Sequence, residues 1–186
     1  MEGPQETYQN ALSKPVEWRE VLSLGHPTER VVEAVQRQDG KAARIWIDTE
    51  FNEHEHRDEL ISMALVVEDG REWYEVLHCP FPGHWVVENV IRKLGKQPIS
   101  REAFADSLRE FLSNYEAVHI IGDWPTDIAL FCDALIVAPG CRIDTPALTM
   151  EVIRLDGESE DPHNALADAR GIRDAHLAAQ ARKELA

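Results

Sequence analysis

Residues 59–67 read Glu-Leu-Ile-Ser-Met-Ala-Leu-Val-Val, and this nearly continuous apolar run limits the fold more than any other segment. A strand with water on one face alternates apolar and polar residues, whereas a strand covered on both faces is apolar along most of its length. We therefore expect a buried strand in a sheet that has helices packed on both faces.

Two further strands are expected next to this run in the sequence, at residues 45–51 and 73–77. The tetrapeptide Glu68-Asp69-Gly70-Arg71 lies between the second and third strands and is typical of a hairpin turn. Three consecutive strands therefore open the domain.

Helices and strands are expected to follow the hairpin, because apolar residues recur at helical spacing between short apolar runs. The predicted elements, in chain order, are a helix over residues 85–94, a helix over 100–112, a strand over 117–123, a helix from 125, a strand over 141–144, a helix over 148–155 and a helix over 164–183. Gly95 is expected to end the first of these helices and Ser100 to cap the second. Pro125 suits the first turn of the third.

This order predicts an α/β fold, with a mixed sheet of about five strands flanked by helices, antiparallel at its start and parallel later. The ribonuclease H-like architecture has the same order of elements. Residues 44–186 are expected to form this domain. Residues 1–43, which are punctuated by Gly, Pro and Gln and contain one expected helix over residues 29–36, are assigned to an N-terminal extension.

The formal net charge of −15 argues against a broad basic face of the kind that binds long nucleic acids. A polyanionic ligand would have to be held locally, for example by carboxylates carrying divalent cations, although the same acidity also describes an ordinary solvated surface. The three cysteines are an odd number without zinc-site spacing, and we see neither a signal peptide nor a membrane span. We expect a cytoplasmic protein that does not bind membranes.

Two acidic segments are candidates for a metal site. Asp48 and Glu50 are two residues apart on an expected strand, so both point to the same face, and oxygen-rich sites of this kind suit Mg²⁺ or Mn²⁺. Asp127 begins the helix that follows the strand over residues 117–123, where a carboxylate is also explained by the helix dipole. Asp123, close by, either orients a substrate or simply ends the strand.

His163 and Asp168 form a third candidate segment. Five residues on a regular helix would place them about 140° apart around its axis, which would prevent them from sharing a site. We expect His163 to lie in the loop or first turn and Asp168 inside the helix, so that both face one cleft. The alternative interpretation makes His163 a solvent-exposed cap residue.

These segments resemble the three motifs of the DEDDh exonucleases, a superfamily that includes RNase T, oligoribonuclease and the proofreading subunits of DNA polymerases. The matching segments are Asp48-Thr49-Glu50-Phe51, Thr126-Asp127-Ile128-Ala129-Leu130 and His163-Asn164-Ala165-Leu166-Ala167-Asp168-Ala169-Arg170. Within that superfamily the chain is similar to a compact bacterial and phage-type 3′-to-5′ exoribonuclease family. It departs from the common second motif, because Asp123 and Thr126 stand where an asparagine and a phenylalanine are often found.

The resemblance implies a two-metal mechanism with Mg²⁺ or Mn²⁺. Asp48 would bridge the two ions, Glu50 and Asp168 would complete one site, and Asp127 would bind the other ion directly or through water. His163 would deprotonate the attacking water, and the products would be nucleoside 5′-monophosphates. Four further residues are predicted to contact the substrate: Thr49, Phe51, Asp123 and Trp124.

Several alternatives stay open from the sequence. Phe51 is equally explained as a core residue, core or lid packing is the simpler explanation for Trp124, and Arg170 is expected to pair with a surface acid rather than to bind phosphate. RNA is the expected partner, with single-stranded DNA as the alternative substrate of a proofreading-type exodeoxyribonuclease. A non-catalytic nucleic-acid-binding or scaffold domain is the competing hypothesis from another class. A homodimer is expected by resemblance alone.

Overall fold

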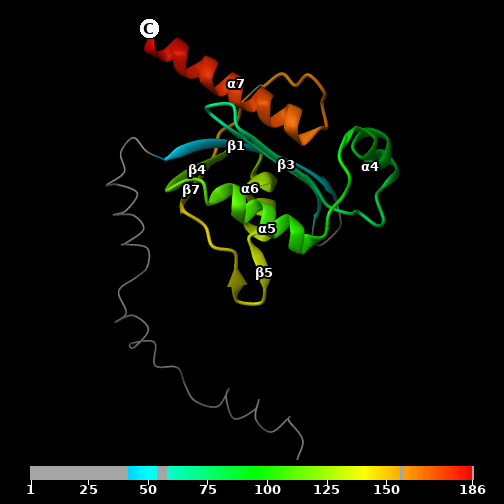
Figure 1. Ribbon diagram of the computed structural model, residues 1–186. Helices are drawn as coiled ribbons and strands as arrows, with labels where there is room; N and C mark the ends of the chain where they lie inside the picture. The colour runs from blue at the N-terminus through cyan, green and yellow to red at the C-terminus, as the bar shows by residue number, and fades with distance from the viewer. Residues whose placement is uncertain (1–41, 54–57, 156, 186) are drawn as a thin grey trace, which may run out of the picture. The chain divides into compact units, whose positions relative to one another are not determined.

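The computed structural model describes residues 42–53, 58–155 and 157–185, and it contains a five-stranded mixed sheet (Figure 1). The strands are β1 (Ala43–Asn52), β2 (Glu59–Val67), β3 (Glu72–Val76), β4 (Ala117–Gly122) and β7 (Ala147–Val152), in the order β3-β2-β1-β4-β7. The pairs β1–β2 and β2–β3 are antiparallel, whereas β1–β4 and β4–β7 are parallel. The predicted α/β sheet is therefore confirmed. The predicted extension over residues 1–43 and its helix over residues 29–36 lie outside the described residues, apart from residues 42 and 43.

The hairpin between β2 and β3 forms at the predicted turn. Gly70 has φ +90°, a backbone conformation that side-chain-bearing residues rarely adopt. Its N–H donates to the carbonyl oxygen of Val67 at 3.0 Å, which closes the turn. This turn aligns β3 with the outer edge of β2, so the antiparallel part of the sheet is built from local sequence.

Helices cover both faces of the sheet, as the apolar run in β2 predicts. They are α4 (His84–Asn89), the 3₁₀ turn η1 (Ile91–Lys93), α5 (Arg101–Leu112), α6 (Pro125–Ala134) and α7 (Ala165–Glu184). Met63 and Leu65 of β2 belong to the core cluster that includes residues of α5 and α6, and Ala64 and Val66 pack with residues of α7 on the other face. Figure 1 shows α7 on the opposite side of the sheet from α5 and α6. No helix in the described part of the chain is long and apolar enough to span a membrane.

The helix starts follow from their capping residues. The Ser100 hydroxyl accepts a hydrogen bond from the Ala103 N–H at 3.2 Å and so caps α5, as predicted. Pro125 occupies the first turn of α6, where its missing N–H costs no helical hydrogen bond. The side chain of Asn164 accepts from the Ala167 N–H at 3.2 Å at the start of α7.

Three predicted elements are wrong or incomplete. Residues 148–155 were expected to form a helix, but Ala147–Val152 form β7, which pairs in parallel with β4 along its whole length. The leucine, methionine and glutamate of this segment favour a helix, and hydrogen bonding to the open edge of β4 overrides that preference.

The strand expected over residues 141–144 is reduced to β6 (Cys141–Arg142). It pairs with β5 (Ile136–Ala138) in a separate two-stranded hairpin and does not join the main sheet. Its place as the fifth strand of the sheet belongs to β7.

The helix expected over residues 85–94 is broken into α4 and η1. Val90, between them, has φ −112° and leaves the α-helical path, while Gly95 at φ +62° ends the segment as expected. Branched side chains restrict rotamers in a helix. Here Val86 and Val90 instead pack on Ile61 of β2.

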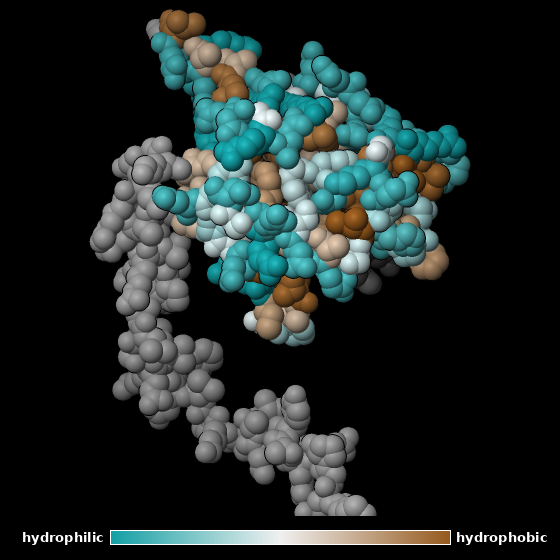
Figure 2. Space-filling view, in the orientation of Figure 1, coloured by the Kyte–Doolittle hydropathy of each residue, from teal (hydrophilic) through white to brown (hydrophobic). Residues whose placement is uncertain are grey.

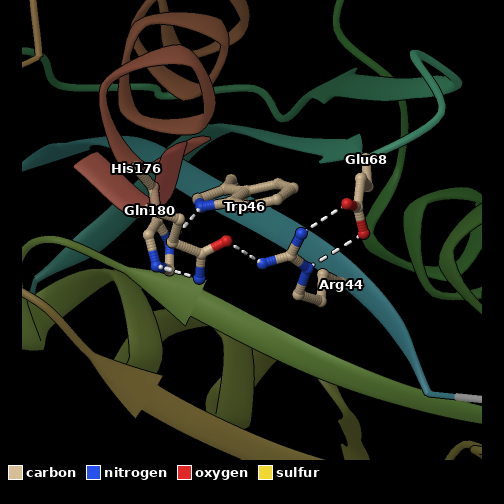
Figure 3. A network of polar contacts seen from close by, with 5 residues as sticks. All are labelled: Arg44, Trp46, Glu68, His176 and Gln180. Carbon is tan, nitrogen blue, oxygen red and sulfur yellow. Dashed lines mark hydrogen bonds and ion pairs between the residues drawn. The ribbon is translucent and has the colours of Figure 1, made fainter. Parts of the chain in front are cut away.

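Polar contacts attach α7 to the face of β1 that also carries Asp48 and Glu50 (Figure 3). The Trp46 indole N–H donates to His176 Nδ1 at 3.0 Å, with the two rings perpendicular. Arg44 donates both to the side-chain oxygen of Gln180 and to the Glu68 carboxylate. These contacts set the position of α7, and hence of Asp168 in its first turn, relative to β1.

Candidate active site

One cavity of about 630 Å³ collects the predicted site residues from four parts of the chain. Its walls are formed by Asp48, Thr49, Glu50, Phe51, Asn52, Glu53, Trp85, Val86, Trp124, Asp127, His163 and Asp168. This set contains eight of the nine predicted catalytic, metal-binding and substrate-binding residues; the ninth, Asp123, is not part of it. The contributing elements are β1, α4 and the amino-terminal ends of α6 and α7.

Asp48 and Glu50 lie on the face of β1 that is covered by α7, two residues apart as the strand period requires. The pairing with β2 is irregular just beyond them, since Glu50 pairs with Ser62 while Phe51 pairs with Leu60. Such bulges bend a strand and change the direction of nearby side chains. The two strands pair again at Phe51 with Leu60 and at Asn52 with Glu59, so the irregularity lies directly beside the acidic pair.

The carboxylates form two groups that share one member. Ligand oxygens of Asp48, Glu50 and Asp168 all lie within 4.8 Å of one another, and so do those of Asp48, Asp123 and Asp127. Asp123, predicted to contact substrate, thus lies with the second acidic group. Two adjacent sets of oxygen ligands with a shared carboxylate suit a pair of hard divalent cations.

Burial and mutual repulsion perturb these carboxylates strongly. Burial raises the pKa of Asp48 well above its usual range, and the neighbouring Asp127 and Glu50 carboxylates raise it further. Burial also raises the pKa of Glu50 to about 8, with Asp168 and Asp127 adding to the effect. For Asp127, burial raises the pKa to about 7, although hydrogen bonds from Thr49 oppose the rise. Carboxylates that are this costly to ionise are typical of functional sites.

Oδ2 of Asp48 fits a metal ligand for a separate reason. Within the described residues this oxygen is shielded from solvent and accepts no hydrogen bond. A buried acceptor without a partner is costly, and a divalent cation would satisfy it. The chemistry of the donor set and this unpaired oxygen both fit Mg²⁺ or Mn²⁺.

Thr49 holds Asp127 in place between β1 and α6. Its backbone N–H and its hydroxyl both donate to Oδ1 of Asp127, at 3.1 and 2.6 Å. The backbone N–H of Thr49, a residue predicted to contact the substrate, thus orients this carboxylate. Gly122, at the end of β4, allows α6 to approach, since a Cβ there would lie 3.3 Å from side-chain atoms of Ile47 and Ile128.

His163 lies in the loop before α7, and Asn164 rather than His163 caps the helix. It has φ +67°, and its backbone N–H donates to Oδ2 of Asp168 at 2.9 Å. The imidazole is exposed at the cavity, with the edge of the Trp85 ring packed against it at a centroid distance of 4.9 Å. The turn of the backbone at His163 therefore brings the imidazole and the Asp168 carboxylate to the same cavity.

The aromatic residues and Arg170 are also placed. Trp124 is 49% exposed, so a core position for it is wrong, and the guanidinium of Arg154 lies 5.4 Å from its ring centroid. Phe51 both packs against the main core and lines the cavity. Arg170 pairs with Glu72 at 2.6 Å, which confirms the surface ion pair.

Two residues near the cavity were not predicted. Asn52 is buried, donates to the carbonyl oxygen of Phe81 and accepts from the Gly83 N–H at 3.1 Å, which holds the segment leading into α4 and Trp85. Lys93 contacts the loop that carries His163. The only sequence signal for Asn52 is weak: it is a polar residue that directly follows the segment Asp48-Thr49-Glu50-Phe51. No local pattern marks Lys93.

Comparison with known proteins identifies relatives of this chain. No family model matches the sequence. Two curated proteins of Mycobacterium tuberculosis, from strains CDC 1551 / Oshkosh and ATCC 25618 / H37Rv, are each named 3′-5′ exoribonuclease. Each is 32% identical to this chain, and the matched region covers 68% of this chain and 87% of the relative.

Proposed function

The chain belongs to the family of these 3′-5′ exoribonucleases, and we propose that it is itself a metal-dependent 3′-to-5′ exoribonuclease of the DEDDh type. Its substrates would be single-stranded or short RNA ends, and its products nucleoside 5′-monophosphates. The observation that carries this proposal is that Asp48 belongs to both groups of clustered carboxylates. A carboxylate shared in this way is the expected centre of a two-metal site.

Asp48, Glu50 and Asp168 would hold one Mg²⁺ or Mn²⁺ ion, and Asp48 with Asp127 would hold the second. When bound, such a pair stabilises the attacking and leaving oxygens of an in-line displacement at phosphorus. Thr49 keeps one oxygen of Asp127 occupied by hydrogen bonds. That carboxylate is therefore fixed in orientation before any ligand arrives.

His163 would take the proton from the attacking water. Its imidazole is exposed at the cavity, while its own backbone N–H holds the Asp168 carboxylate at 2.9 Å. This hydrogen bond ties the loop that carries the base to a residue that would hold a metal ion. Placing the base within reach of the water is the geometric requirement for general-base catalysis.

Four residues are proposed to contact the RNA around this centre: Thr49, Phe51, Asp123 and Trp124. Trp124 is the best placed to stack on a base, because its ring is half exposed at the cavity wall. The nearby Arg154 adds a positive charge that a phosphate would meet in an otherwise acidic protein. Aromatic stacking of this kind tolerates any base, which suits an enzyme acting on successive nucleotides.

The test uses 5′-labelled RNA and DNA oligomers incubated with Mg²⁺, with Mn²⁺ or with chelator. We expect stepwise shortening of RNA from the 3′ end that requires metal. Asp48→Asn should abolish it, and His163→Asn should lower kcat about a hundredfold or more. The control is Asp106→Asn, the same change at an exposed acid that pairs with Arg109 on the surface of α5.

Four outcomes would contradict the proposal, in whole or in part. Shortening that continues in chelator would exclude metal dependence. A strong preference for DNA would favour the exodeoxyribonuclease alternative. Binding of RNA without any shortening would favour the non-catalytic alternative. Full activity of His163→Asn would refute the general-base role alone.

A further inference from the structure

One residue outside the acidic cluster, Lys93 of η1, contacts the loop that carries His163 on both sides of that histidine. Its Nζ lies 2.9 Å from Oδ1 of Asp161 and also donates to the carbonyl oxygen of Pro162. Its own carbonyl oxygen accepts from the side-chain amide of Asn164 at 2.8 Å. The residues immediately before and after His163 are therefore both bound to this single turn.

The loop needs such support because of its backbone conformation. His163 is in the left-handed region at φ +67°, where a side-chain-bearing residue is disfavoured. Strained backbone of this kind persists where surrounding contacts hold it. The ring of Trp85 from α4, packed against the imidazole edge, is a further contact from the same α4–η1 segment.

We propose that Lys93 is a positioning residue that holds the loop over residues 161–163 so that the His163 imidazole faces the carboxylates. This inference rests on the proposed function, because it assigns His163 as the base. The segment from α4 to η1 then has a role beyond packing on the sheet: it bears both Lys93 and Trp85, which together fix the loop and the ring. Asn52, by tying the segment before α4 to the end of β1, connects this support to the strand that carries Asp48 and Glu50.

A second effect of Lys93 must be separated from the first. Its positive charge lowers the pKa of Glu50 and so opposes the rise in pKa that burial of this carboxylate causes. Removing Lys93 would change both the loop and this field. Asp161→Asn removes one partner of the ammonium group in the loop while leaving Lys93 in place, so it tests the loop alone.

The experiment compares four variants by steady-state kinetics on an RNA oligomer. Lys93→Met and Asp161→Asn should lower kcat about tenfold or more with KM changed less than about twofold, because misplacing a catalytic group acts on the chemical step. Lys93→Arg should restore most of kcat. The matched control is Lys96→Met, since Lys96 likewise joins a carboxylate, Glu75 at 2.7 Å, and a carbonyl oxygen, that of Tyr74, but lies outside the loop contacts.

A structural measurement accompanies the kinetics. In protein with isotopically labelled histidine, the His163 ring signals, identified by their loss in His163→Asn, are shifted by the ring current of Trp85. Lys93→Met and Asp161→Asn should move these signals toward those of a free histidine, whereas Lys96→Met should leave them unchanged. Melting curves establish that each variant is folded.

The outcomes separate the two proposals. Wild-type kcat in Lys93→Met would overturn the positioning role, and so would a kcat loss in Lys93→Met that is absent from Asp161→Asn, which would assign the effect to Glu50. If the wild-type protein degrades no RNA, the proposed function fails. Unchanged His163 signals in Lys93→Met would by themselves overturn the proposal that Lys93 holds the loop over residues 161–163.

Discussion

Asp48 shows how one residue acquires its properties from its neighbours. On β1 it is a carboxylate two positions before another, which means little in itself. Folding surrounds it with Glu50, Asp127 and Asp168 and shields its Oδ2 from water, so that burial and repulsion both disfavour its charged form. Without a cation the cluster is a source of instability, and with divalent cations the same oxygens become ligands.

The pH dependence of stability follows from this residue-scale effect. The pKa of Glu50 rises from 4.5 to about 8 on folding, so between these values the unfolded chain releases a proton that the folded protein retains. Raising the pH through this range therefore favours unfolding of the metal-free protein, and a rise of one in pKa corresponds to about 1.4 kcal/mol. Thermal melts in chelator across this range, compared with Glu50→Gln, should show the loss of stability in the wild type and a flatter profile in the variant.

Added Mg²⁺ should reverse that loss. A cation that binds only the folded state raises its stability by mass action, and deprotonated carboxylates bind it best, so the rise in melting temperature should grow with pH. Asp48→Asn should melt higher than the wild type in chelator and respond little to Mg²⁺. In chelator, the stability of the wild type relative to Glu50→Gln should fall as the pH rises. A rise instead would contradict the raised pKa of Glu50.

At the scale of elements, the backbone of the loop before α7 packs directly against the backbone of that helix. A Cβ on Gly157 would lie 3.0 Å from the backbone of Gly171, and a Cβ on Gly171 would overlap the carbonyl oxygen of Glu158. The loop over residues 157–163 therefore crosses α7 closely enough to exclude side chains at both positions. This crossing sets the path on which His163 later turns back toward Asp168.

Gly171→Ala tests this crossing, because the sign of its effect on the stability of the protein depends on whether the loop obstructs the new methyl group. In an unobstructed helix, replacing glycine with alanine stabilises the protein by about 1 kcal/mol. Here the methyl group must displace the loop, and overpacking of this kind costs about 1–3 kcal/mol. We expect a lower melting temperature and a lower kcat, measured by calorimetry and by RNA shortening. A higher melting temperature would mean that the loop moves aside without cost.

At the scale of the whole molecule, four of the exposed large apolar residues lie on the β5–β6 hairpin and on the edge strand β7. Ile136 and Val137 of the β5–β6 hairpin are each more than half exposed, and Met150 and Val152 of β7 are exposed on the outer strand of the sheet. Figure 2 shows an apolar patch on the projecting hairpin against a largely hydrophilic surface. Exposed apolar patches mark interaction sites, and we propose a homodimer formed through the β5–β6 hairpin.

Light scattering after size-exclusion chromatography tests the dimer. We expect a mass twice that of the 21.1 kDa chain, and a shift to the monomer mass in Ile136→Glu and Val137→Glu, because a buried charge without a partner opposes association. Leu185→Glu is the matched control. Leu185 is 90% exposed and lies at the end of α7, which Figure 1 places opposite the β5–β6 hairpin. A monomeric wild-type protein, or one unaffected by the hairpin variants, would refute this interface.

The sequence by itself determined the features that depend on near neighbours. The apolar run in β2, the turn at Gly70 and the helix starts at Ser100 and Pro125 rest on a few consecutive residues, and each formed as predicted. The acidic candidates were recognisable for the same reason, since strand periodicity alone puts Asp48 and Glu50 on one face.

Only the tertiary structure decided what depends on distant partners. Residues 147–152 became a strand because β4 offered an open edge, and Asp48 joined two acidic groups because β1, α6 and α7 converge on it. The side-chain amide of Asn164 is hydrogen-bonded to Lys93, 71 positions away in the sequence, and Asn52 is hydrogen-bonded to Gly83, 31 positions away. Such contacts form only when the packed core has already fixed the backbones that carry them, so no local pattern in the sequence records them.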